Sequence, residues 1–265
     1  MFRRFMIGMA AVVALSAMPL LAQNVDEIIA SNVKAHGGLD KIKAAKTLRS
    51  TGKLNSGSFE AVISQEAKRP DFVRQEFTIQ GLTAVQAYDG KTGWQIMPFG
   101  GKKDAELMGE DDLKEIQEAA DFDGPLVDYK AKGNQVELVG KEPVEGTDAY
   151  KLKVTLKNGD VRFFYLDTDS FLEIKQESKK MVRGSERETE TSIGDYKDVE
   201  GMMLPFSFEG GAKGSPNKQK VTIDKYEVNA PVDDSRFKMP PKPAATEEKK
   251  EEKKPEPKKS EEIKK

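Results

Sequence analysis

Few side chains in this sequence could carry out a chemical reaction. The chain has no cysteine and a single histidine, His36. Thiolate catalysis, disulfides, cysteine-based metal sites and sites built from two histidines are therefore excluded, and a Ser-His-Asp arrangement would depend on His36 alone. This residue stands in Ala35-His36-Gly37-Gly38, just past a predicted helix. A polar or cationic residue there can contact the last helical carbonyls, so we expect a capping role.

Acidic residues gather at two places without forming a recognisable catalytic pair. Asp121, Asp123 and Asp128 could bind Ca²⁺, but their spacing lacks the ligand ladder and final glutamate of an EF-hand loop. We interpret them as a helix exit and turn. Glutamates alternate over 186–190 in a strand that is polar on both sides, which favours a solvent-exposed or edge strand over a glycosidase site. We predict no catalytic residue, no metal, no cofactor and no enzymatic activity.

The first 22 residues are predicted to be a signal peptide. Arg3 and Arg4 precede a nearly unbroken apolar run that ends at Ala22, the arrangement of a secretory leader. The alternative is a retained anchor, because the run is barely long enough to span a bilayer. Pro19 near its end favours cleavage. We therefore expect export to the periplasm.

The other end, residues 241–265, is almost only lysine, glutamate and proline, with 9 Lys and 7 Glu. Its Glu-Glu-Lys-Lys pattern places like charges at i,i+4, which destabilises a helix, and such a segment cannot bury apolar surface. We predict a disordered tail; the alternative is a tether to anionic envelope material. Each end carries a net charge of +2, so residues 23–240 carry −6 of a total of −2. This acidic body gives no indication of nucleic-acid binding.

The body is predicted to be mainly β (α+β). Helical spacing is confined to Val25–Ala35, Leu39–Ala45 and a stretch from Asp111 to Ala120. The rest alternates with period two between turns such as Asn158-Gly159, which indicates about a dozen antiparallel strands. So long a sheet must curl or close, so we expect a single curled antiparallel sheet that wraps around its few helices as an open barrel.

A curled sheet covered by small helices can enclose an apolar cavity. Several strands carry more apolar residues than one packed face needs, although a fully packed core would also accommodate them. Because side chains of a strand alternate between faces, we expect about half of the candidates to face the cavity. The candidate ligand-binding residues are Phe59, Ile63, Phe72, Phe77, Trp94, Ile96, Leu152, Val154, Phe163, Tyr165, Leu204 and Phe206. For Trp94, a buried anchor with its N–H satisfied is the alternative to a cavity wall.

Residues 24–240 resemble the LolA/LolB-like superfamily, in the branch of outer membrane lipoprotein-sorting proteins. The resemblance is carried by the order and spacing of short motifs, most of them turns. They are Ala35-His36-Gly37-Gly38 with Leu39-Asp40-Lys41-Ile42, Gly52-Lys53, Tyr88-Asp89-Gly90 with Gly93-Trp94-Gln95-Ile96, the segment 195–205, and Tyr226-Glu227-Val228-Asn229 followed by Asp233, Asp234 and Phe237.

The resemblance implies an unclosed barrel of about eleven strands around a hydrophobic cavity. It also implies a monomeric periplasmic carrier or chaperone that shields lipoprotein acyl chains or lipids and moves them from an inner-membrane donor toward an outer-membrane acceptor. Hiding each CH₂ group of an acyl chain is worth about 0.8 kcal/mol, so a lined cavity without catalytic residues suits that role. The alternatives are an envelope lipid-sensing regulatory protein that signals to a membrane partner, and an envelope spacer with a packed core.

Overall fold

The computed structural model describes residues 24–182 and 184–241. The predicted signal peptide, 1–22, and the predicted tail apart from residue 241 lie outside these residues. Within them, no helix is both long and apolar enough to cross a membrane.

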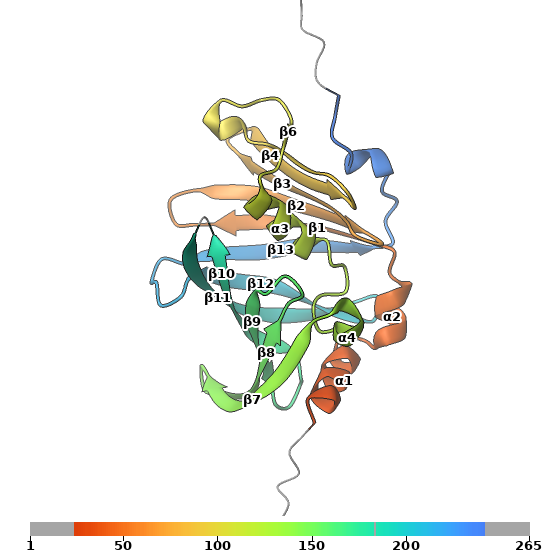
Figure 1. The fold of residues 1–265 in the computed structure, drawn as a ribbon, viewed down its shortest axis with the longest axis vertical. Coiled ribbons are helices and arrows are strands. Elements are labelled where there is room, and N and C mark those ends of the chain that lie inside the picture. The colour runs from red at the N-terminus through yellow and green to blue at the C-terminus, as the bar shows by residue number, and fades with distance from the viewer. Residues whose placement is uncertain (1–23, 183, 242–265) are drawn as a thin grey trace, which may run out of the picture.

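One antiparallel sheet of 13 strands dominates the fold (Figure 1). Strands that follow one another pair as hairpins, except that β1 pairs with β13 and β6 does not pair with β7. The sheet therefore has two arms, β1–β6 and β7–β13, which join at its centre, and it stays open at β6 and β7. The strands are β1 (Thr47–Asn55), β2 (Glu60–Lys68), β3 (Phe72–Ile79), β4 (Leu82–Asp89), β5 (Gly93–Ile96), β6 (Glu106–Leu107), β7 (Gln135–Val144), β8 (Thr147–Thr155), β9 (Val161–Asp167), β10 (Glu173–Val182), β11 (Ser185–Val199), β12 (Met202–Ala212) and β13 (Gln219–Val228).

This architecture confirms the predicted single, curled and unclosed antiparallel sheet. The strand count differs slightly from the expected eleven, and the two-residue β6 is too short to show a period-two pattern. The glutamate-rich strand β11 lies inside the sheet, between β10 and β12, and not at an edge. Its polar outer face is satisfied by ion pairs such as those of Glu190 with Lys175 and Lys218, which with other hydrogen bonds lower the pKa of Glu190 to about 2.

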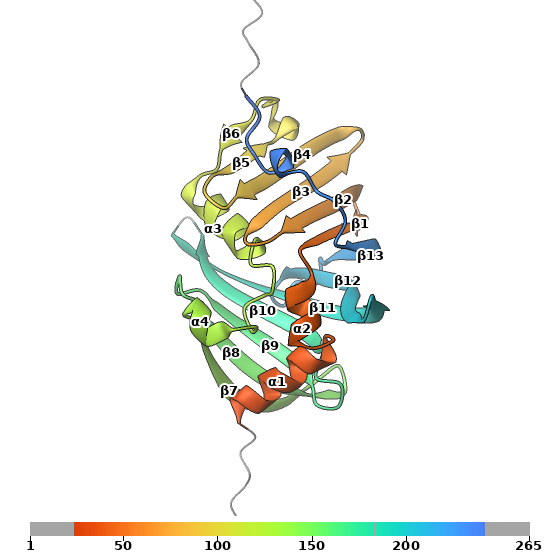
Figure 2. The ribbon, with the colours of Figure 1, turned by 90° about the vertical axis from the view of Figure 1, so that its right-hand side faces the viewer.

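Four short helices occupy the concave side of the sheet (Figures 1 and 2). They are α1 (Val25–Ala35), α2 (Leu39–Ala44), α3 (Glu110–Ala119) and α4 (Tyr129–Lys132). The first three match the predicted segments, whereas the single turn of α4 is too short for a helical period. Ile28 and Ile29 of α1 pack on Leu152 and Val154 of β8, and Ile116 of α3 packs on Val73 of β3. Each arm of the sheet thus has its own helical cover.

The register of the strands fixes which side chains face the helices. Direct cross-strand partners lie on the same face of an antiparallel sheet. Ile63 pairs with Phe77, Phe77 with Ala84, and Gly52 with Ile63. Phe77 lies four residues after Val73 on β3, so both side chains point to the face on which α3 packs. The cross-strand partners of Phe77, and Gly52 opposite Ile63, therefore lie on the same concave face.

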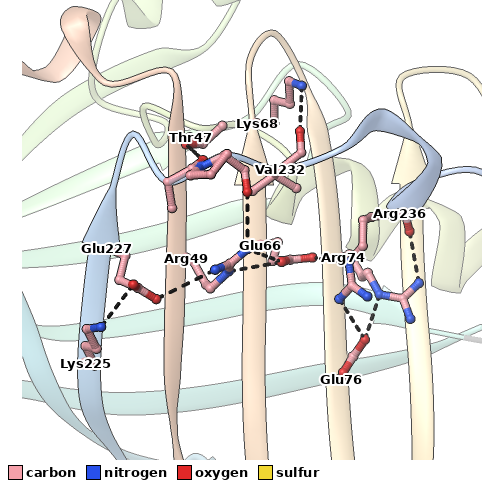
Figure 3. Close-up of polar contacts among 12 residues, drawn as sticks. Thr47, Arg49, Glu66, Lys68, Arg74, Glu76, Lys225, Glu227, Val232 and Arg236 are labelled. Atoms are coloured by element: carbon pink, nitrogen blue, oxygen red, sulfur yellow. Dashed lines mark hydrogen bonds and ion pairs between the residues drawn. The ribbon is translucent and has the colours of Figure 1, made fainter.

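The convex face of β1–β5 is covered by the chain that follows β13, here called the C-terminal strap (residues 230–239) (Figure 2). Its Phe237 is fully buried and its ring lies 5.4 Å from that of Phe72. The indole Nε1 of Trp94 donates to the Phe237 carbonyl at 2.7 Å. Arg236 pairs with Glu66 and reaches Glu76 of β3 (Figure 3). The strap is therefore fixed by both apolar and ionic contacts.

Truncating the strap anchor should destabilise the whole sheet. Phe237→Ala removes a fully buried ring from against Phe72, so we expect the free energy of unfolding to fall by about 3–5 kcal/mol. The measurement is urea unfolding followed by circular dichroism. The matched control is Phe99→Ala, because Phe99 is 47% exposed and its loss should change stability by about 0.5 kcal/mol or less. Equal effects of the two variants would contradict a structural role for the strap.

Candidate functional site

An apolar hollow of about 670 Å³, here called the sheet cavity, lies on the concave face. It lies over β1–β4, β12 and β13, away from the helices. This volume is within the range of ligand pockets. Its apolar walls are Leu48, Ile63, Phe77, Ala84, Met97, Phe99, Phe208, Val221 and Ile223.

Aromatic side chains lead from the sheet cavity to solvent. The ring of Phe77 lies 6.1 Å from that of Phe59 and 6.1 Å from that of Phe99, both in edge-to-face geometry. Phe59 is 37% exposed and Phe99 is 47% exposed. In the hydrogen-bond register, Phe59 and the β3–β4 turn lie at the same end of the sheet. The opening of the cavity is therefore at these hairpin tips.

A second hollow of about 400 Å³, here called the helix cavity, lies between α1, α2 and the sheet. Leu48 lines both cavities, so the two adjoin. Residues 121–127 form one wall of the helix cavity. This loop is held by Asp123, which binds the guanidinium of Arg69 and the ammonium of Lys43. The helix exit and turn expected around Asp123 are present, and the carboxylate binds these two cations.

A third hollow of about 620 Å³ lies beside α3, and most of the residues that line it are polar or charged. Charged residues from three parts of the chain line it, among them Lys114, Lys132 and Arg162. Lys132 pairs with Asp121, and Arg162 pairs with Glu118. Two of its cations are therefore paired with carboxylates of the same lining.

Seven of the predicted wall residues lie on or beside the concave side, but only three of them line a cavity. Ile63 and Phe77 line the sheet cavity, and Leu204 lines the helix cavity. Phe59 stands at the opening against Phe77, and Phe206 is buried edge-on against Tyr226. The remaining two, Leu152 and Val154, face inward but are fully buried beneath α1.

The other five predicted wall residues lie on the convex face, so the expectation that they line the cavity is corrected. Alternation places Phe72, Trp94 and Ile96 opposite the cavity, where the strap covers them. Trp94 is a buried anchor with its N–H satisfied, the alternative considered above. Phe163 and Tyr165 lie outward beneath the ammonium of Lys151. Aromatic content alone could not reveal which face each strand turns outward, since both faces are covered.

Sequence reasoning missed several lining residues. Phe208, Val221 and Ile223 share the cavity with Ile63 because β1 pairs with both β2 and β13. Phe99 enters from a short 3₁₀ turn, Pro98–Gly100, which has no strand period. Phe208 could have been found from the sequence, because it lies two residues after Phe206 and so points to the same face of the strand. The pairing of β1 with β13 left no signal in the sequence.

His36 bridges α1 and the sheet beside the helix cavity. Its Nδ1 lies 2.8 Å from the Met203 carbonyl and its Nε2 lies 2.6 Å from Glu173 Oε2. Asn32 and Tyr196 also donate to Glu173. The backbone of His36 caps α1 as expected, but its ring contacts β12 and β10 instead of the helical carbonyls.

His36 and Glu173 each shift the pKa of the other toward its charged form. Burial lowers the pKa of His36, but the hydrogen bond and charge of Glu173 outweigh it, so the pKa lies above its usual value. Burial raises the pKa of Glu173, but the donors around it, His36 foremost, bring it below its usual value. A carbonyl and a carboxylate both accept hydrogen bonds, so both ring nitrogens act as donors when Glu173 is ionised. The pair is a salt bridge that locks α1 onto the sheet.

Among the described residues, no group of three acidic or histidine side chains is arranged to hold a metal ion.

Comparison with known proteins relates this geometry to a known fold. No family model matches the sequence, and no curated protein matches it significantly. A LolA superfamily protein from Nitrosomonas europaea superposes with a TM-score of 0.51 at 12% identity, covering 78% of this chain and 96% of that one. The chain has the LolA fold. A DUF1329 family protein from Desulfovibrio piger superposes with a TM-score of 0.58 at 13% identity, covering 81% of this chain and 97% of that one.

The salt bridge within this LolA-like fold should contribute to stability over a defined pH window. The raised pKa of His36 adds stability that is complete below 6.5 and is lost as pH rises through the folded value. The lowered pKa of Glu173 adds stability that is complete above 4.5 and is lost as pH falls through the folded value. The coupling energy between His36→Gln and Glu173→Gln should thus be largest between pH 4.5 and 6.5.

We expect this coupling to be about 1–3 kcal/mol in that window and to shrink at about pH 9, as measured by urea unfolding of the double-mutant cycle. The control is the cycle of Lys130 and Asp26, an ion pair without histidine. Its coupling should not fall between the window and pH 9. A coupling between His36 and Glu173 that is independent of pH would contradict the assignment.

Proposed function

We propose that this protein is a periplasmic carrier that binds acyl chains of lipids or lipoproteins in the sheet cavity. The observation that carries the proposal is the cavity itself, about 670 Å³ with largely apolar walls. The LolA fold supports the proposal, since a LolA superfamily protein shares the fold. Release of the ligand toward an outer-membrane acceptor and uptake from an inner-membrane donor are parts of the same proposal.

Physical chemistry favours a binding role. Each CH₂ group transferred from water to an apolar wall gains about 0.8 kcal/mol, so a single acyl chain supplies ample driving force. A carrier must also release its cargo, and the open edges of the sheet allow the concave face to widen. The proposal includes no catalytic step, and the protein acts as a monomer. The structural comparisons lend no support to the alternative of a lipid-sensing regulator.

Filling the cavity should abolish binding. Ile63→Trp places a large ring among Phe77 and Ile223, so we expect the affinity for an apolar fluorescent probe to fall at least about tenfold, equivalent to about 1.4 kcal/mol. The matched control is Val62→Trp, because Val62 is the preceding residue on the same strand and is 57% exposed on the other face. The control should bind like wild type.

Native mass spectrometry of the protein purified from membranes provides the complementary test. We expect co-purifying lipid on the wild type and on Val62→Trp, and none on Ile63→Trp. Absence of bound lipid from the wild type, together with no uptake of the apolar probe, would refute the carrier proposal.

A further inference from the structure

A row of uncharged polar side chains crosses the floor of the sheet cavity. Direct cross-strand pairing joins Ser50 to Gln65, Gln65 to Gln75, Gln75 to Gln86, and Gln86 to Gln95. We call these residues the glutamine row. The same register makes them one line on the concave face, and the first four of them line the cavity. Adjacent strands lie about 4.8 Å apart, so the row extends over roughly 14 Å from Gln65 to Gln95.

The hydrogen-bonding capacity of the row is mostly unused by the protein. Gln75 Nε2 donates to Gln65 Oε1 at 3.0 Å. Within the described part of the chain, the amide of Gln86 makes no hydrogen bond, although it lines the cavity. Each amide carries two N–H donors and a carbonyl acceptor, so this is not a closed ladder that merely stabilises the sheet. Free donors and acceptors therefore face the hollow.

The glutamine row lies between the apolar walls of the cavity and the packed core beneath α3. On one side, two residues along each strand and about 7 Å away, lie the cavity walls Ile63, Phe77 and Ala84. On the other side lie Val73 and Tyr88, which belong to the packed core beneath α3. On β2, β3 and β4 the polar groups thus stand at the inner end of the cavity, and the apolar walls stand between them and the opening.

We propose that the sheet cavity binds an amphiphile whose polar part is uncharged and rich in hydroxyl or amide groups. The four members of the glutamine row that line the cavity, Ser50, Gln65, Gln75 and Gln86, hydrogen-bond this part, while Ile63 and Phe77 contact the acyl chain. The inference rests on the proposed carrier function and narrows its cargo. Amides match hydroxyls and other amides as paired donors and acceptors. They offer no charge to neutralise a carboxylate or a sulfate, whose desolvation would be costly.

The test compares four probes that each carry a twelve-carbon chain, alkyl or acyl, each below its micelle-forming concentration. Dodecyl maltoside carries hydroxyls and N-dodecanoyl glycinamide carries amides, so the two distinguish a sugar head group from a peptide-like one. Dodecylphosphocholine and dodecyl sulfate carry charges. Isothermal titration calorimetry should show that at least one of the two uncharged probes binds the wild type about tenfold more tightly than both charged probes.

Two variants connect this preference to the row. Gln86→Leu and Gln75→Leu keep side-chain size but remove the amide, so each should reduce binding of the preferred uncharged probe by about tenfold, the equivalent of one or two neutral hydrogen bonds. Binding of a purely apolar fluorescent probe should not weaken. Gln86→Leu breaks no hydrogen bond within the described chain, so it remains informative if loss of the Gln65–Gln75 bond impairs folding.

The matched control is Gln95→Leu, because Gln95 belongs to the same row but does not line the cavity; its amide reaches Glu106 of β6 instead. This variant should retain the preference. If the wild type binds all four probes equally, or if Gln86→Leu leaves the preference intact, the inference is wrong and the carrier proposal stands. If the wild type binds neither these probes nor the apolar probe, the carrier proposal itself fails.

Discussion

The fold depends on the strand register of one continuous antiparallel sheet. Because side chains alternate along each strand, register alone decides whether an apolar residue meets a helix, the sheet cavity or the convex surface. A slip of one residue in β2 would exchange Ile63 with Val62 and turn the cavity wall outward. The pairing of β1 with β13 is the central element, since it joins two arms that are each built from sequential hairpins.

The two faces of the β1–β6 arm are covered by different parts of the chain. In the β1–β6 arm, α3 covers only the part of the concave face around Val73 and Tyr88. The C-terminal strap covers the convex face, where Trp94 and Phe237 are buried. In the other arm, Ile28 and Ile29 of α1 pack over Leu152.

Polar groups inside the curled sheet have two different roles. His36 and Glu173 are fully engaged with each other and with their neighbours, so they hold α1 in place. The glutamine row is only partly engaged, so it faces the hollow with capacity to spare. The difference separates a structural buried network from a surface that is free to hydrogen-bond the proposed ligand, because unsatisfied polar groups are costly unless solvent or a ligand completes them.

Local patterns in the sequence determined most of the elements, since period-two alternation and turn residues act over a few positions. The boundaries of α1, the hairpin at Asn158-Gly159 and the capping position of His36 follow from such patterns. The short β6 and α4 could not be predicted in this way, because segments of two to four residues are too short to show a periodic pattern of apolar residues. Aromatic residues marked the strands but not their faces: Trp94 and Phe77 have similar sequence surroundings and lie on opposite sides of the sheet. Only the tertiary structure decided that the strap covers Trp94 and that four strands align Gln65, Gln75, Gln86 and Gln95, because cross-strand register joins residues that no local pattern connects.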